Sequence, residues 1–281
     1  MAAAMTVIQE EKLKSGVAIN RDTDPNQTGL IGEEFNDLTT SLGSLPGKRT
    51  TTNPNFAGLL VELLSQAKVK PGDSVAINAS GSFPALNIAV LSAVHVLQLN
   101  PVIISSVGAS TYGANIAGWT WLDMERVLRE KGIFPYTSTA ASLGGLADNP
   151  GGLDGRGIPL GLEAVARSGI PYLDEKGHKT LKKDVDHRME LYSQALGGRR
   201  PAAFINVGGS LASLGEGPEV LSLAPGLSFL VPSSRSTHPG VLFRMNQMGV
   251  PVIHLLNVKK LARRYGLPVD PIPLPHIPSG R

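Results

Sequence analysis

Short apolar runs that end in turns of glycine, serine and asparagine most constrain the fold of this chain. The clearest run, "VAINASGSFP" (75–84), is followed by an uncharged helical pattern and then by a second run, "PVIISS" (101–106). A buried strand, a helix and another strand in this order predict a parallel pair joined by a right-handed crossover. The turn after the first strand is either a ligand-binding or catalytic loop, or only a tight connection.

The alternation of strands and helices continues to the C-terminal region. We expect strands at 74–79, 101–106, 136–142, 170–173, 202–207 and 250–257, and helices at 53–68, 84–98, 119–132, 160–168, 179–195, 240–248 and 258–265. Such alternation is typical of an α/β fold, and we predict an open, mostly parallel, Rossmann-like sheet with helices on both faces. Residues 1–52 are expected to form an N-terminal helix (1–16) and a wrapping loop segment, and residues 53–281 the α/β domain.

Composition excludes several classes of function. The 281 residues contain no cysteine, so disulfides, thiolate metal sites and cysteine nucleophiles are absent. The net charge is +3 and no basic run is interleaved with aromatics, so nucleic acid is not an expected partner. There is no G-x-G-x-x-G and no H-E-x-x-H, so neither a cofactor nor a metal is expected. The N-terminus lacks the apolar region of a signal peptide, and no anchor is recognised in this chain.

Three of the predicted strands end in small polar turns, at 78–84, 105–115 and 206–215, and a fourth ends near His254. Ligands of open α/β sheets bind at the carboxyl ends of the strands, so these turns define a candidate rim that also includes Ser105. The predicted ligand-binding residues are Asn78, Ser80, Gly81, Ser82, Ser106, Ser110, Asn206, Gly208, Gly209, Ser210, Lys48 and Arg49.

The rim suits an anion. Ser82 precedes a helix whose first N–H groups lack backbone partners, and these donors favour a carboxylate or phosphate. Gly81 would let the backbone approach a ligand closely. Local structure explains the same residues equally well, because Ser82 could simply cap the helix and Gly81 could simply permit the turn.

A nucleophile elbow is a sharper interpretation of the first turn. "NASGS" matches G-x-S-x-G only loosely, since Asn78 and Ser82 stand at the glycine positions. Ser80, Asp123 and His254 occur in the order required for a serine nucleophile, an acid and a base. Against this, His254 lies in an apolar run typical of a core histidine, and Asp123 could be solvated on its helix.

Two further motifs are weak. "DTDPNQTGLIGE" (22–33) places oxygen ligands from Asp22 to Glu33 at the spacing of a calcium loop, but Gln27 replaces the required glycine. A plain Asp/Asn turn is the favoured interpretation. "GSLPGKRTTTN" fails as a phosphate loop, although Lys48 and Arg49 could still contact an anion.

Nearly the whole chain, about residues 20–275, resembles the poly-gamma-glutamate system protein family. The stretches that carry the resemblance are "DPNQTGLIGEE", "KRTTTNPNFAGLLVELL", "GDSVAINASGSFPALNIAVLSA", "SSVGASTYGAN", "FINVGGSLASLGE" and "GVPVIHLLNVKKLARRYGLPVDPIPLP". The resemblance implies an accessory role in synthesis or export of an anionic polymer. It also implies an extracytoplasmic location, with a membrane anchor in the full-length form and membrane-bound synthesis machinery as a partner. It supplies no catalytic residues. A shorter segment, "GDSVAINASGSFPALNIAVLSA", is similar to the phosphate-binding turn of sugar isomerase domains.

These observations leave three hypotheses. The first is an accessory protein that binds poly-gamma-glutamate or a glutamyl precursor at the rim. The second is a serine-dependent amidohydrolase or transpeptidase acting on that polymer. The third is a sugar-phosphate-binding protein of the sugar-isomerase-domain type.

Overall fold

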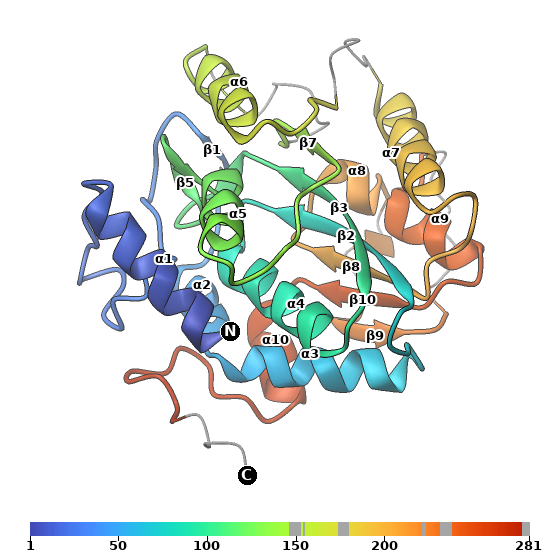
Figure 1. Ribbon diagram of the computed structural model, residues 1–281, viewed down its shortest axis with the longest axis horizontal. Helices are drawn as coiled ribbons and strands as arrows, with labels where there is room; N and C mark the ends of the chain where they lie inside the picture. The colour runs from blue at the N-terminus through green and yellow to red at the C-terminus, as the bar shows by residue number, and fades with distance from the viewer. Residues whose placement is uncertain are drawn as a thin grey trace.

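The computed structural model describes residues 1–145, 153, 155–173, 180–217, 219–220, 223–230 and 238–276. Its centre is a six-stranded sheet with the strand order β7-β3-β2-β8-β10-β9 (Figure 1). The five strands from β7 to β10 pair in parallel, and β9 runs antiparallel to β10 at one edge. The strands are β2 (Ser74–Ser80), β3 (Asn100–Ser106), β7 (Ala140–Ser142), β8 (Ala203–Val207), β9 (Gly226–Ser228) and β10 (Val252–Leu255). The α/β class expected from the sequence is therefore correct.

The first strand–helix–strand unit forms as the sequence predicts. β2 and β3 pair in register from Ser74 opposite Asn100 to Ser80 opposite Ser106, and α4 (Pro84–Val96) connects them. Most of α4 is buried because apolar side chains occur on nearly all sides of this helix. A helix of this kind must be covered on more than one side, and α4 contacts both α3 (Asn55–Gln66) and α1 (Ala2–Lys14).

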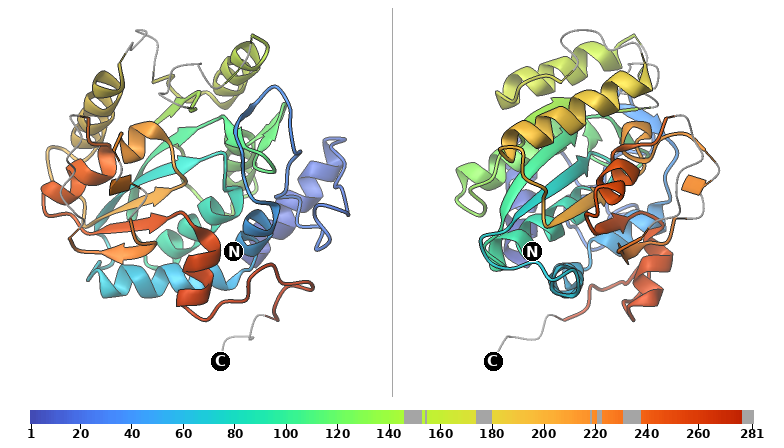
Figure 2. Two further views of the ribbon diagram at one scale, coloured as in Figure 1. Left: turned by 180° about the vertical axis from the view of Figure 1, so that it is seen from behind. Right: turned by 90° about the vertical axis from the view of Figure 1, so that its right-hand side faces the viewer.

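Alternating residues of the strands enter two separate apolar clusters, because successive side chains of a strand point to opposite faces. Val75 and Ile77 pack with α3, α4 and α10 (Val258–Arg264). Ala76 and Phe204 pack with α7 (Leu181–Ala195), α8 (Leu211–Leu214) and α9 (Val241–Gln247). Helices therefore cover both faces of the sheet, as the side view in Figure 2 shows.

The N-terminal segment is built into the same structure. The expected first helix is α1, which packs on α4 and on α5 (Trp121–Glu130) and buries Ile8 in the main core. The rest of the segment is not only loop, because β1 (Thr39–Ser41) pairs in parallel with β4 (Ala109–Ser110), and α2 (Leu45–Thr51) follows. Figure 1 shows this segment, in blue, beside the central sheet.

The remaining differences from the expected elements have local causes. α5 begins at Trp121 because Thr120 and Asp123 form a capping box at its start. The short hairpin of β5 (Asn115–Ile116) and β6 (Trp119–Thr120) precedes it. The expected strand at 170–173 makes only a single bridge, between Tyr172 and Ala141, and follows α6 (Gly157–Ser168). β9 was not expected from the sequence. No helix in the described part of the chain is long and apolar enough to cross a membrane.

Candidate functional site

A cavity of about 410 Å³ opens at the carboxyl ends of the central strands. Most of its lining residues are serines and glycines, and four large apolar side chains also line it. The lining residues are Thr40, Ser41, Leu42, Gly43, Ser44, Ser80, Ser82, Phe83, Ser106, Gly108, Ser110, Gly145, Gly209, Ser210, Leu211 and Leu256. The cavity has the size of a small-molecule site.

The strand order brings the three predicted turns together at this cavity. The chain runs outward from β2 to β3 and β7, and then returns to place β8 on the other side of β2. Because Ser80 is level with Ser106, and Asn78 with Asn206, the turns after β2, β3 and β8 begin side by side. Six of the predicted ligand residues line the cavity: Ser80, Ser82, Ser106, Ser110, Gly209 and Ser210.

One wall comes from a segment that the sequence did not assign to the site. Residues 40–44 line the cavity because β1 pairs with β4, so that Ser41 lies opposite Ser110. Gly43 is bound to Thr111 in both directions: its N–H donates to Thr111 Oγ1 at 2.7 Å, and its carbonyl accepts from that hydroxyl. "TTSLGS" contains serine and glycine, but its strand is too short to show a periodicity that would have revealed the pairing.

Lys48 lies directly behind the serine wall. Its side chain is 2% exposed, and its ammonium donates to Ser110 Oγ at 2.6 Å and to the carbonyl of Ser82. The same group lies 4.1 Å from the centre of the Phe83 ring, a favourable cation–π position. Burial lowers the pKa of Lys48 to about 7, and no acidic side chain among the described residues offsets this effect. Within the described residues, the hydrogen-bond partners of Lys48 are therefore a hydroxyl and a carbonyl, and none is a carboxylate.

Arg49, predicted together with Lys48, does not line the cavity. Its guanidinium forms two hydrogen bonds of 2.6 Å with the carboxylate of Asp270 in the C-terminal tail. The hydrogen bond raises the pKa of Arg49, so the guanidinium remains charged in this pair. Adjacent positions on α2 therefore have different partners: Lys48 faces the sheet and Arg49 faces the tail.

The predicted glycines Gly81 and Gly208 allow close packing within and between the turns. A Cβ on Gly81 would lie 2.5 Å from the carbonyl oxygen of Val107, so this position must be glycine for the first two turns to approach each other. Gly208 has φ +89° and packs against Ser80. Gly81 does not line the cavity, and its close approach to protein backbone fits the interpretation in which it permits the turn.

Asn78, Asn206 and His254 form a buried ladder across three neighbouring strands, beneath the cavity. Asn78 Nδ2 donates to Asn206 Oδ1 at 2.9 Å, and Asn206 Nδ2 lies 3.0 Å from His254 Nδ1. Burial lowers the pKa of His254 to about 4, so the imidazole is neutral at neutral pH. None of these three side chains lines the cavity.

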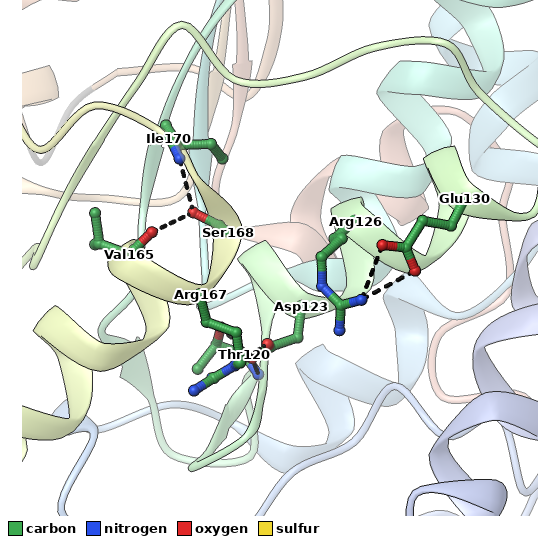
Figure 3. A network of polar contacts seen from close by, with 8 residues as sticks. All are labelled: Thr120, Asp123, Arg126, Glu130, Val165, Arg167, Ser168 and Ile170. Carbon is green, nitrogen blue, oxygen red and sulfur yellow. Dashed lines mark hydrogen bonds and ion pairs between the residues drawn. The ribbon is translucent and has the colours of Figure 1, made fainter.

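Asp123 lies in the first turn of α5, where it contacts Thr120 and Arg167 (Figure 3). Its carboxylate accepts from the N–H and hydroxyl of Thr120, both at 2.8 Å, and pairs with Arg167 of α6. Burial raises the pKa of Asp123, but the hydrogen bonds from Arg167 and Thr120 outweigh it, and the net shift is downward. Asp123 thus caps α5 and joins it to α6.

The structure does not assemble the predicted triad. Ser80 is at the cavity, where its Oγ accepts from the N–H of Ser82, but His254 is held by Asn206 and Asp123 by Arg167. Ser105 also differs from its expected place, because its side chain points to the opposite face of the sheet and contacts Ser138 and Trp121.

The loop that resembles a calcium site is closed by its own hydrogen bonds. Asp24 is buried, and its carboxylate accepts from the Thr28 hydroxyl and the N–H of Gly29. Asn26 instead donates to the carbonyl of Pro271. Within the described residues there is no group of three or more acidic or histidine side chains that could hold a metal ion.

Scans of the chain against protein-family models and against curated proteins find no match. The interpretation of the cavity therefore depends on its own geometry and on the resemblance noted in the sequence.

Proposed function

We propose that the cavity binds a glutamyl ligand through its carboxylate, in a protein that assists bacterial poly-gamma-glutamate synthesis or export. The strand order β7-β3-β2-β8-β10 supports a Rossmann-like interpretation of the sheet. In such sheets the ligand crevice lies where the strand order changes direction, which here is between β2 and β8. The cavity lies at this position.

The observation that carries the proposal is a serine-lined cavity backed by a buried lysine that has no carboxylate partner in the described structure. Burying an ammonium without a counter-ion is costly, so its retention favours an anionic ligand at or near this point. Serine hydroxyls of the wall and the N–H groups of Gly209 and Ser210, which have no hydrogen-bond partner in the described residues, supply further donors. Hydrogen bonds between such donors and an ionised carboxylate are among the strong ones.

The biological setting follows from the resemblance to the poly-gamma-glutamate system family. We propose an extracytoplasmic protein that is membrane-associated in its full-length form and works beside membrane-bound synthesis machinery. In this role the cavity would hold a chain end or a glutamyl precursor.

Isothermal titration calorimetry with a short γ-glutamate oligomer tests the proposal. We expect Lys48→Met to weaken binding by about 10- to 100-fold, because the positive charge behind the wall that attracts the carboxylate is lost. Lys260→Met is the matched control, since Lys260 is exposed on α10, and we expect no change. Affinity should also fall as the pH rises through about 7, where Lys48 loses its proton.

Two results would contradict the proposal. If both lysine variants weaken binding equally, the interaction is non-specific surface attraction. If a sugar phosphate binds in this cavity and the γ-glutamate oligomer does not, the ligand is a phosphorylated sugar rather than a glutamyl group.

A further inference from the structure

Ser110 differs from the other serines of the cavity wall by its contact with an amine. Its Oγ lies 2.6 Å from Lys48 Nζ, within hydrogen-bond distance. Ser110 lies in β4 opposite Ser41 of β1, and it is 7% exposed, at the cavity surface. Ser80 and Ser82 accept hydrogen bonds from the backbone N–H groups of Ser82 and Ser110, and neither hydroxyl contacts a basic side chain in the described structure.

The surroundings of Lys48 favour its neutral form. The cations of α10, the helix that packs on α2, are exposed: Lys259, Lys260, Arg263 and Arg264. Arg49 is paired with Asp270, and the turns that follow β2 and β3 contribute only uncharged groups to this contact. With its pKa near 7, a large share of the amine is unprotonated at neutral pH and can accept a proton.

We propose that Ser110 and Lys48 form a nucleophile–base pair that cleaves or transfers amide-linked acyl groups bound in the cavity. A serine hydroxyl is a weak nucleophile until an adjacent base takes its proton, and an unprotonated lysine is such a base. The substrate class, a γ-glutamyl amide, rests on the proposed function. The pair itself rests on the contact between the two side chains.

Each step of the proposed reaction is balanced by a proton transfer to or from Lys48. As Ser110 Oγ bonds to the acyl carbon, its proton passes to Lys48 Nζ, and the carbonyl oxygen becomes an oxyanion. The carbon–nitrogen bond then breaks, and the Lys48 ammonium returns the proton to the leaving amine. Water, or an acceptor amine, attacks the Ser110 ester through Lys48 in the same way, which releases the acyl group and regenerates the hydroxyl. Hydroxyl groups of the wall are available to donate to the oxyanion.

Covalent labelling with a fluorophosphonate tests the pair without assuming a natural substrate. Intact-mass and peptide mass spectrometry should place one adduct on Ser110 in the wild-type protein. The labelling rate should rise as the pH increases through about 7, the reverse of the pH dependence expected for carboxylate binding. Ser110→Ala should remove the adduct, and Lys48→Met should slow labelling by about 100-fold or more.

Ser65→Ala is the matched control, because Ser65 is exposed on α3 and does not line the cavity, and labelling should be unchanged. The wild-type pH profile keeps the test decisive even if the Lys48 variant does not fold. An adduct on another serine, no adduct, or a rate that does not rise with pH would each overturn the proposal.

Calorimetry separates this inference from the proposed function. If the γ-glutamate oligomer binds and Ser110 is not labelled, the cavity is a binding site without the nucleophile. If Ser110 is labelled with the expected pH profile and the oligomer does not bind, the pair stands and the glutamyl assignment falls.

Discussion

Burial of Lys48 behind the cavity wall lowers the free energy of unfolding when its amine is charged. In the unfolded chain its pKa is the ordinary value of 10.5, and in the folded protein it is about 7. Between these values the unfolded state binds more protons, so the contribution of Lys48 makes the protein more stable as the pH rises from about 7 to about 10. Below pH 7 the charged amine must be buried, and the full cost is present.

This linkage gives a prediction for Lys48→Met, which replaces the amine with an uncharged side chain of similar length. The variant should gain stability relative to wild type at about pH 6, and the gain should shrink by roughly 1.4 kcal/mol for each pH unit above 7. Urea unfolding of both proteins at several pH values measures the difference. A difference that is constant with pH would mean that Lys48 remains charged in the folded protein throughout.

Lys48 and Arg49, two adjacent basic residues, show the limit of predicting single side-chain contacts from the sequence. Lys48 and Arg49 were both predicted to contact an anion, but only Lys48 reaches the serine wall. α2 has seven residues, too few for a periodic pattern to show which side is buried. Its orientation depends on the pairing of β1 and on Asp270, and neither is visible in the local sequence.

Among the elements, the turn between β2 and α4 fixes the spacing of the cavity wall. A methyl group on Gly81 would collide with the carbonyl oxygen of Val107, which belongs to the turn after β3. Gly81→Ala should therefore lower the free energy of unfolding by about 1–3 kcal/mol, as overpacked positions do. It should also weaken ligand binding, because the two turns move apart.

Gly58→Ala is the matched control for this prediction. Gly58 lies in α3 with no atom within 4 Å of an added Cβ, so alanine should raise the free energy of unfolding by about 0.5–1 kcal/mol. Thermal unfolding and calorimetry compare the two variants. If Gly81→Ala is tolerated as well as Gly58→Ala, the turns do not depend on close contact.

The long elements were predictable because their patterns are unambiguous. β2, α4 and β3 follow from a short apolar run, a helix apolar on most sides and a second apolar run. β1 and β9 have three residues each, and their pairing partners are distant in sequence. No local propensity identifies such strands, because distant contacts stabilise them.

For the whole molecule, the pair of Arg49 and Asp270 links the N-terminal segment to the C-terminal tail. Both side chains are largely buried, and the N–H of Asp270 also donates to Thr50 Oγ1. In a double-mutant cycle of Arg49→Ala and Asp270→Ala, we expect a coupling energy of about 1 kcal/mol. Urea unfolding measures it, and simple additivity of the two changes would show that the pair contributes nothing.

The site as a whole was only partly accessible from the sequence. The three polar turns and their meeting at one edge follow from the rule that parallel strands share a carboxyl edge, and six of the predicted residues line the cavity. The triad failed because strand residues such as His254 were placed by chain order, whereas their partners are set by register. The Ser110–Lys48 contact spans 62 residues and has no sequence motif.

The ion pair between Arg49 and Asp270 also bears on the order in which contacts form during synthesis. Ribosomes deliver a chain from its N-terminus, so α2 emerges 221 residues before the carboxylate that holds it. The serine turns are synthesised earlier, so the ion pair that joins α2 to the tail can form only after them. A chain that stops before Asp270 therefore has the serine turns but lacks the ion pair between α2 and the tail.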